Sequence, residues 1–310
     1  MNGSARFRET ARALRHLAGG RWLEVLLLQA SPLLGAAFGG ASAIGPGLVT
    51  LALGSVLLTA HVFVFNDWAG HHGDLNDPDR ASRVFARHGI RSGTVAAIAV
   101  VLLAAVMAAF AALGFTAVLL GAAIACLGIL YSNPRAAGKG VPVLASLLHL
   151  VGGALHFLLG YQLARAIDAR GLAIALFFGL VFAGGHLNQE VRDHDADRRN
   201  GIRTTAVVLG PRRALLASLG VFSAAYWELA LLAAIGVVPR PLLWASALLW
   251  PLHAVWSSRA LRSGPGIDQA RWLQRRYRIL FAIVGVVMLL SLAADGKEDS
   301  VPRSAEVADH

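Results

Sequence analysis

The sequence has little charge and almost no cysteine. Charged residues make up 15% of its 310 residues, and the single cysteine, Cys126, excludes an internal disulfide bond. Hydrophobic residues make up 56%, which is typical of a protein with several membrane spans. The net charge of +10 does not indicate a nucleic-acid partner, because the arginines lie between apolar segments and form no basic domain.

The apolar runs are continuous and lack the short alternating pattern of barrel strands, so they predict membrane helices. Nine of them are long enough to cross a hydrocarbon core of about 30 Å. We expect an all-α integral membrane protein, with nine transmembrane helices in one domain at 1–295 and a polar, disordered tail at 296–310. The nine segments are 22–42, 46–65, 93–113, 115–132, 141–163, 171–189, 213–236, 240–257 and 278–294.

The basic residues predict the orientation of the bundle in the membrane. If the N-terminus is cytoplasmic, 23 of the 28 Lys and Arg residues fall on the cytoplasmic side. We therefore expect a protein of the inner or plasma membrane, with its N-terminus in the cytoplasm and its C-terminus on the opposite side. The five basic residues on that opposite side are Arg165, Arg170, Arg240, Lys297 and Arg303.

Acidic residues are few, and they are unevenly placed. Eight of the 18 lie in two short stretches, each directly after a span that is expected to end in the cytoplasm. The stretches are "FNDWAGHHGDLNDPDR" (65–80) and "NQEVRDHDADRRNG" (188–201), where the predicted cytoplasmic loops 66–92 and 190–212 begin. Their acidic residues are Asp67, Asp74, Asp77, Asp79, Glu190, Asp193, Asp195 and Asp197.

Such clusters of carboxylates indicate a cation site. Asp193 and Asp197 share one face if the helix continues, and neighbouring carboxylates repel each other unless a cation neutralises them. Mg²⁺ takes oxygen ligands and often binds one or two carboxylates together with substrate phosphates. The alternative is that Asp77, Asp79 and Asp195 are solvated loop acids paired with arginines. That alternative explains the whole pattern poorly, since the other loops carry few acids.

The two stretches together resemble the motifs of the UbiA superfamily of intramembrane prenyltransferases. "DHDADRRNG", which starts at Asp193, matches the family pattern DxxxDxxxG, and "NDWAGHHGD", which starts at Asn66, matches NDxxDxxxD except at Gly70. "YSNPRAAGK", from Tyr131 to Lys139, resembles a Tyr–Pro–Lys segment of the family, and Arg21 resembles an arginine that opens the first helix.

The resemblance implies a UbiA-like bundle with an active-site mouth on the cytoplasmic side. The implied reaction is Mg²⁺-dependent transfer of a prenyl group, through an allylic carbocation, from a polyprenyl diphosphate to a small aromatic or lipophilic acceptor in the bilayer. It assigns the metal to Asp67, Asp74, Asp193 and Asp197, with Lys139 as a further catalytic residue. The diphosphate would be held by Asn66, Arg21, Tyr131, Lys139, Arg192 and Arg198, and the acceptor pocket would contain His149, His186 and Asn188.

Gly70 departs from the family pattern, because it removes one carboxylate. Either the metal site is weakened, or the glycine makes room for an unusual donor or for a bent loop with positive φ. A terpene cyclase on the same scaffold, which needs no acceptor, is the alternative function. A transporter is disfavoured, because the acids gather at one face and leave the middle of the membrane nearly empty. A CDP-alcohol phosphotransferase is disfavoured, because its DGxxAR…G…DxxxD motif is absent.

Overall fold

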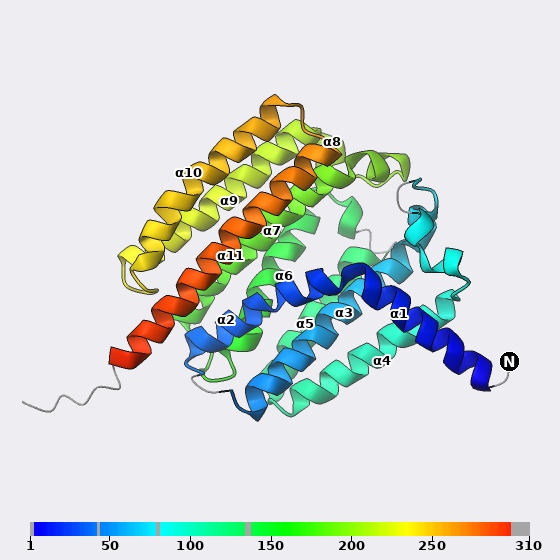
Figure 1. Ribbon diagram of the computed structural model, residues 1–310, viewed down its shortest axis with the longest axis horizontal. Coiled ribbons are helices and arrows are strands. Elements are labelled where there is room, and N and C mark those ends of the chain that lie inside the picture. Colours follow the sequence, from blue (N-terminus) through cyan, green and yellow to red (C-terminus); the bar gives the residue numbers. More distant parts are fainter. Residues whose placement is uncertain (1–2, 42–43, 79–80, 134–137, 299–310) are drawn as a thin grey trace, which may run out of the picture.

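The computed structural model describes residues 3–41, 44–78, 81–133 and 138–298 (Figure 1). These ranges contain helices and no strands, which confirms the predicted all-α class. Three 3₁₀ turns accompany the α-helices: η1 (Ala81–Arg83), η2 (Phe85–His88) and η3 (Gly138–Gly140). The α-helices are α1 (Gly3–Leu28), α2 (Ala30–Gly39), α3 (Pro46–Leu75), α4 (Ser92–Ala111), α5 (Phe115–Ser132), α6 (Leu144–Tyr161), α7 (Ala169–Arg199), α8 (Thr205–Leu209), α9 (Pro211–Ala234), α10 (Pro241–Arg262) and α11 (Ile267–Glu298).

Eight segments of the described chain are long and apolar enough to cross a membrane. They match eight of the nine predicted spans. The remaining predicted span, 240–257, forms α10, which is long enough but less apolar, because Pro251, His253 and Ser257 interrupt its hydrophobic residues. The eight segments are Trp22–Gly39, Pro46–Leu75, Ser92–Ala111, Phe115–Ser132, Leu144–Tyr161, Ala169–Arg199, Pro211–Ala234 and Ile267–Ala294.

Two helices continue beyond the points where the sequence predicts loops. α3 runs ten residues past 65, and α7 runs ten residues past 189, so both acidic stretches are largely helical. The first stretch has no proline before Pro78, and the second stretch has none. α7 ends just before Gly201, which has a positive φ of 68°. The predicted loops therefore begin later than expected, because polar composition by itself does not end a helix.

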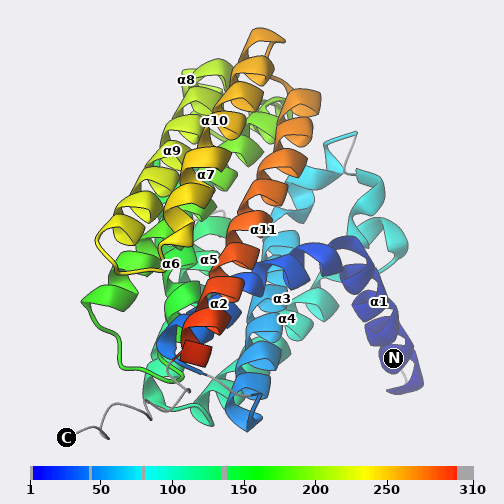
Figure 2. The same cartoon turned by 60° about the vertical axis from the view of Figure 1, so that its left-hand side comes forward.

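The helices form two groups, and α6 joins them because it packs against α5 of one group and α7 of the other. α3, α4 and α5 pack together on one side, and α7, α9, α10 and α11 pack together on the other (Figures 1 and 2). α7 has its most extensive contacts with α6 and α9. α7, which carries one acidic stretch, is therefore held in the middle of the bundle.

The contact between α2 and α6 depends on glycine. A Cβ atom at Gly35 would collide with the Phe157 carbonyl oxygen, and one at Gly160 would collide with the Pro32 carbonyl oxygen. Small residues allow helices in a membrane to approach this closely, and the contact stabilises the bundle through van der Waals packing.

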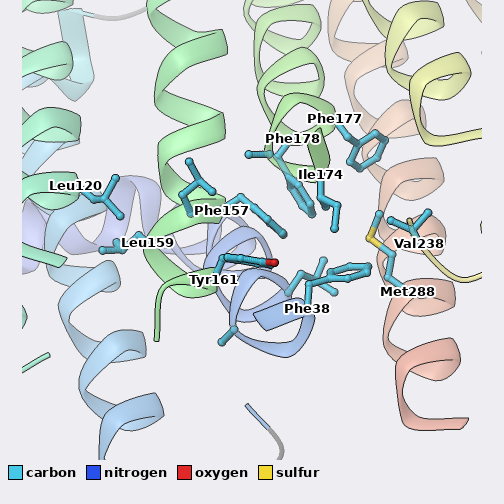
Figure 3. Packing of buried hydrophobic residues seen from close by; sticks show 14 of the residues in the cluster. Phe38, Leu120, Phe157, Leu159, Tyr161, Ile174, Phe177, Phe178, Val238 and Met288 are labelled. Carbon is cyan, nitrogen blue, oxygen red and sulfur yellow. The ribbon is translucent and has the colours of Figure 1, made fainter. Parts of the chain in front are cut away.

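Part of the main buried cluster lies near the start of α7 (Figure 3). The rings of Phe157 and Phe178 stack with centroids 4.6 Å apart, and Tyr161 lies beside them. Asp168 caps α7, because its Oδ1 accepts hydrogen bonds from the Gly171 amide (2.7 Å) and from the Tyr161 hydroxyl (2.9 Å). These two hydrogen bonds lower the pKa of Asp168. The cap fixes where α7 begins and hence where its far end lies.

The N-terminal helix is attached to α4 by a charged contact. Both Glu9 oxygens lie 3.0 Å from Arg91 Nε, and Thr94 donates to Glu9 from 2.8 Å. The hydrogen bond from Arg91, with that from Thr94, lowers the pKa of Glu9 to about 2. The contact therefore stays ionised across the physiological pH range.

Candidate functional site

The ends of α3 and α7 are neighbours, although more than one hundred residues separate them in sequence. Arg199 Nη2 lies 3.1 Å from Oδ1 of Asp77, a buried carboxylate just after α3. A Cβ atom at Gly73 would lie 3.6 Å from the side chain of Asn200. The fold thus brings the two acidic stretches to the same end of the bundle.

The first stretch presents its acids from a regular helix. Asp67, Gly70 and Asp74 follow one another at i, i+3 and i+7 on α3, so they share a face. Gly70 is exposed and does not have a positive φ, so the bent-loop interpretation of this glycine is wrong. His71 Nδ1 lies 2.6 Å from the Trp68 carbonyl oxygen, and its ring lies against Phe85 of η2.

The second stretch pairs each of its proposed metal ligands with a basic side chain. Lys139 Nζ, from η3, lies 2.9 Å from Oδ1 of Asp197, whose side chain is only 3% exposed. Arg192 holds Asp193 with two hydrogen bonds, of 2.9 and 3.1 Å, and reaches Gln274 of α11 at 3.4 Å. Two carboxylates and two cations are therefore already matched at the end of α7.

The charge on Lys139 is well supported. Burial alone would lower the pKa of Lys139, but Tyr131 and the carboxylates of Asp197 and Asp193 outweigh burial and raise that pKa above its ordinary value. Lys139 therefore remains an ammonium group at neutral pH. A cation held in a half-buried position is suited to binding an anionic ligand.

The other predicted diphosphate residues are placed differently from one another. Asn66 donates from Nδ2 to Ser132 Oγ at 3.1 Å, which attaches α3 to the end of α5 next to Tyr131. Arg198 is exposed on the last turn of α7. Arg21 lies in α1, but its side chain is outside the described part of the structure.

Two of the three predicted acceptor-pocket residues come together. The rings of His149 (α6) and His186 (α7) stack with centroids 3.8 Å apart and planes at 11°, and the Tyr131 ring stands nearly perpendicular to both. Asn188 does not join them, because its Nδ2 donates to the Ala270 carbonyl oxygen of α11. His156 lies seven residues further along α6 and contacts α3 instead, where its Nε2 lies 2.8 Å from Ser55 Oγ.

Glu190 is the residue of this region to which the sequence assigned no role. Its side chain is 3% exposed and contacts His186, Thr205 and the Ala206 amide. The sequence contained a signal for this contact, because Glu190 follows His186 by four positions on one helix. The pair was missed because Glu190 was treated only as one of several acids in the stretch.

The donors at the mouth of the bundle suit a hard divalent cation that is shared with a ligand. Among the described residues, no three Asp, Glu, His or Cys side chains converge into a metal site of their own. Asp67, Asp74, Asp193 and Asp197 supply oxygen donors only, and Mg²⁺ typically takes one or two carboxylates, several waters and substrate phosphates. The donor set therefore fits a metal that arrives with a phosphorylated ligand.

The eight long apolar helices, with a charged site at one end of them, are those of a polytopic membrane protein. The family model of the UbiA prenyltransferase family matches residues 27–293, and the chain belongs to that family. No curated protein sequence matches it significantly.

Solved structures agree on the fold. A UbiA homolog from Archaeoglobus fulgidus bound to DMAPP and Mg²⁺ is 17% identical, with a TM-score of 0.69 over 87% of this chain and 96% of that one. A digeranylgeranylglyceryl phosphate synthase is 15% identical, with a TM-score of 0.69 over 90% and 98%. The apo UbiA homolog from Aeropyrum pernix K1 is 19% identical, with a TM-score of 0.68 over 85% and 97%.

Proposed function

We propose that this protein transfers a prenyl group from a polyprenyl diphosphate to a small, lipophilic or aromatic acceptor in a Mg²⁺-dependent reaction. The observation that carries the proposal is that the acidic ends of α3 and α7 lie together at one end of an apolar bundle, where Lys139 is paired with Asp197. A relative with the same fold binds DMAPP and Mg²⁺, which supports the same ligand class here.

Asp67 and Asp74 from α3, with Asp193 and Asp197 from α7, would hold the metal. Bound there, Mg²⁺ would neutralise the diphosphate and stabilise it as a leaving group. Asp193 and Asp197 now contact Arg192 and Lys139, so these cations must turn away when the donor enters. Their charges then become available to the diphosphate oxygens.

Each remaining diphosphate residue has a proposed task. Lys139 and Arg192 would bind phosphate oxygens directly, and Arg198 would add charge at the rim. Asn66 and Tyr131, which lie where α3 meets the end of α5, would orient the donor, and Arg21 would close the site from α1. The prenyl chain would extend into the apolar bundle, which accounts for the placement of a charged site at the mouth of hydrophobic helices.

The acceptor would meet the prenyl carbon below the diphosphate, beside His149 and His186. Asn188 would shape this region only through α11, since it is bonded to Ala270. The less apolar helix α10 would complete nine spans in one domain over 1–295. The N-terminus and the active-site mouth would face the cytoplasm, and the C-terminus would lie on the other side of the inner or plasma membrane.

Product analysis tests this function. The purified protein in lipid nanodiscs would receive Mg²⁺ and prenyl diphosphates of graded length, with and without aromatic acceptors. Mass spectrometry should find a prenylated acceptor and released diphosphate. A cyclic hydrocarbon that forms without acceptor would instead support a terpene cyclase, and turnover of no donor would contradict both functions.

A further inference from the structure

Glu190 is arranged to accept hydrogen bonds on both of its carboxylate oxygens. Its Oε2 lies 3.0 Å from the Ala206 amide nitrogen, and its Oε1 lies 3.1 Å from His186 Nε2 and 3.5 Å from Thr205 Oγ1. A carboxylate accepts hydrogen bonds from the amide, the hydroxyl and the imidazole at once. With Glu190 in this form, His186 donates to it from Nε2.

This hydrogen bond determines the tautomer of His186. With the proton on Nε2, the other ring nitrogen, Nδ1, carries a lone pair. Nδ1 is buried and has no hydrogen-bond partner among the residues that the structure describes, and the side chain is only 3% exposed. Buried polar atoms are nearly always paired in folded proteins, so this nitrogen is placed to meet a group that the protein does not supply.

His149 differs from His186, because it is bonded to a backbone carbonyl oxygen and not to a carboxylate. Its Nδ1 lies 2.8 Å from the Ala145 carbonyl oxygen of its own helix and donates to it. Its ring stacks on one face of His186, and the Tyr131 ring stands nearly perpendicular to that of His186. His149 and Tyr131, whose rings contact His186, are themselves only partly buried.

The position along α7 suits an acceptor. His186 precedes Asp193 by seven residues, so both lie on one face and are separated by about 10 Å along the helix axis. That separation accommodates a diphosphate bound at Asp193 followed by the reacting carbon and the acceptor group. His186 thus lies on the prenyl side of the diphosphate.

We infer that His186 is the general base that takes a hydroxyl proton from the acceptor, and that Glu190 is the positioning residue that fixes its tautomer; this rests on the proposed prenyl transfer. The hydroxyl proton passes to Nδ1. The acceptor oxygen forms a bond to C1 of the prenyl group, or a ring carbon conjugated with it forms that bond and then passes its own hydrogen, as a proton, to the oxygen. The C1–O bond breaks, and diphosphate leaves with the electron pair. The imidazolium is stabilised by the Glu190 carboxylate. The acceptor is therefore a phenol or an alcohol.

The test compares His186→Asn and Glu190→Gln with the wild type. In His186→Asn the amide oxygen takes the place of Nδ1 but cannot accept a proton at neutral pH. Glu190→Gln keeps an oxygen acceptor but removes the charge. His61→Asn is the matched control, because His61 is also 3% exposed and bonds the Ala99 carbonyl oxygen in the other group of helices.

Two readouts separate catalysis from binding. The first is transfer from geranyl diphosphate to 4-hydroxybenzoate or a primary alcohol and to their methyl ethers. The second is the Kd of geranyl S-thiolodiphosphate with Mg²⁺. We expect the wild type to prenylate a hydroxyl acceptor but not its ether. The kcat should fall about 100-fold or more in His186→Asn and less in Glu190→Gln, while the Kd stays unchanged. The control should retain both transfer and binding.

Other outcomes overturn the inference. Wild-type kcat in His186→Asn would show that Nδ1 takes no proton. An equal loss of analogue binding in that variant would show a structural role. Equal prenylation of the ethers, or turnover of donor with no hydroxyl acceptor prenylated, would exclude the acceptor class. If the wild type neither binds the analogue nor releases diphosphate, the proposed prenyl transfer fails and the inference fails with it.

Discussion

Lys139 Nζ lies 2.9 Å from Asp197 Oδ1 and joins two segments that are 58 residues apart in sequence. The ammonium group neutralises a buried carboxylate that we propose as a metal ligand. An unpartnered buried charge is costly, so the lysine stabilises the site until a ligand arrives. We expect both charges to gain stronger partners when the donor and the metal bind. Before that, each neutralises the other.

Replacing Lys139 by Gln removes one charge from the diphosphate site. We expect the KM for the donor to rise about tenfold, which corresponds to roughly 1.4 kcal/mol. The Mg²⁺ concentration for half-maximal activity should not rise, because Asp197 loses a competing cation. Steady-state kinetics at several Mg²⁺ concentrations measure both. Arg240→Gln, at the opposite end of the bundle, is the control. An unchanged KM would show that Lys139 does not bind the donor.

The raised pKa of Lys139 predicts how donor binding depends on pH. Because its pKa lies above the ordinary lysine value of about 10.5, the favourable charge is fully present below that pH. It is lost only as the pH rises through the higher pKa of the folded protein. We expect the ratio of donor KM in Lys139→Gln to that in the wild type to stay constant from pH 7 to about 10. A ratio that falls toward one within that range would mean that Lys139 loses its proton earlier.

Replacing Gly70 by Asp should strengthen the metal site. Gly70 lies in regular helix, and a Cβ atom there meets nothing closer than Asp74 Oδ2 at 3.7 Å, so an aspartate fits beside Asp67 and Asp74. We expect the Mg²⁺ concentration for half-maximal activity to fall about tenfold, or roughly 1.4 kcal/mol. Gly70→Asn, which has the same shape without the charge, is the control. An unchanged or higher Mg²⁺ requirement in the Asp variant would show that this position does not face the metal.

The sequence predicted the helical class and eight of the spans, because long apolar runs can satisfy their backbone in lipid only as helices. It missed the lengths of α3 and α7, since the hydropathy signal ends at the membrane surface while the backbone continues to Asn76 and Asn200. It located the acidic stretches but could not show the pairing of Arg192 with Asp193. The link between His186 and Glu190 also depends on the Ala206 amide, which only the folded chain brings there.

The topology of the bundle can be tested with single cysteines. In a Cys126→Ser background, we expect Asn76→Cys to react with a membrane-impermeant maleimide only from the cytoplasmic side and Arg240→Cys only from the other side. Both positions are exposed, and the first follows α3 while the second precedes α10. The excess of basic residues on the cytoplasmic side is the physical reason. Labelling of Asn76→Cys from outside intact cells would reverse the proposed orientation.

The most direct test of the account is the rate at which the purified protein releases diphosphate and forms prenylated product after single changes on α7. Asp193→Ala and Asp197→Ala each remove a proposed metal ligand, whereas Asp195→Ala removes an exposed carboxylate of the same stretch, which is paired with the adjacent His194. At saturating donor and Mg²⁺, we expect kcat to fall at least about 100-fold in the first two variants and to stay near the wild-type value in the third, with all proteins equally folded. Near-wild-type turnover in both Asp193→Ala and Asp197→Ala would contradict the claim that these carboxylates hold the metal and its diphosphate.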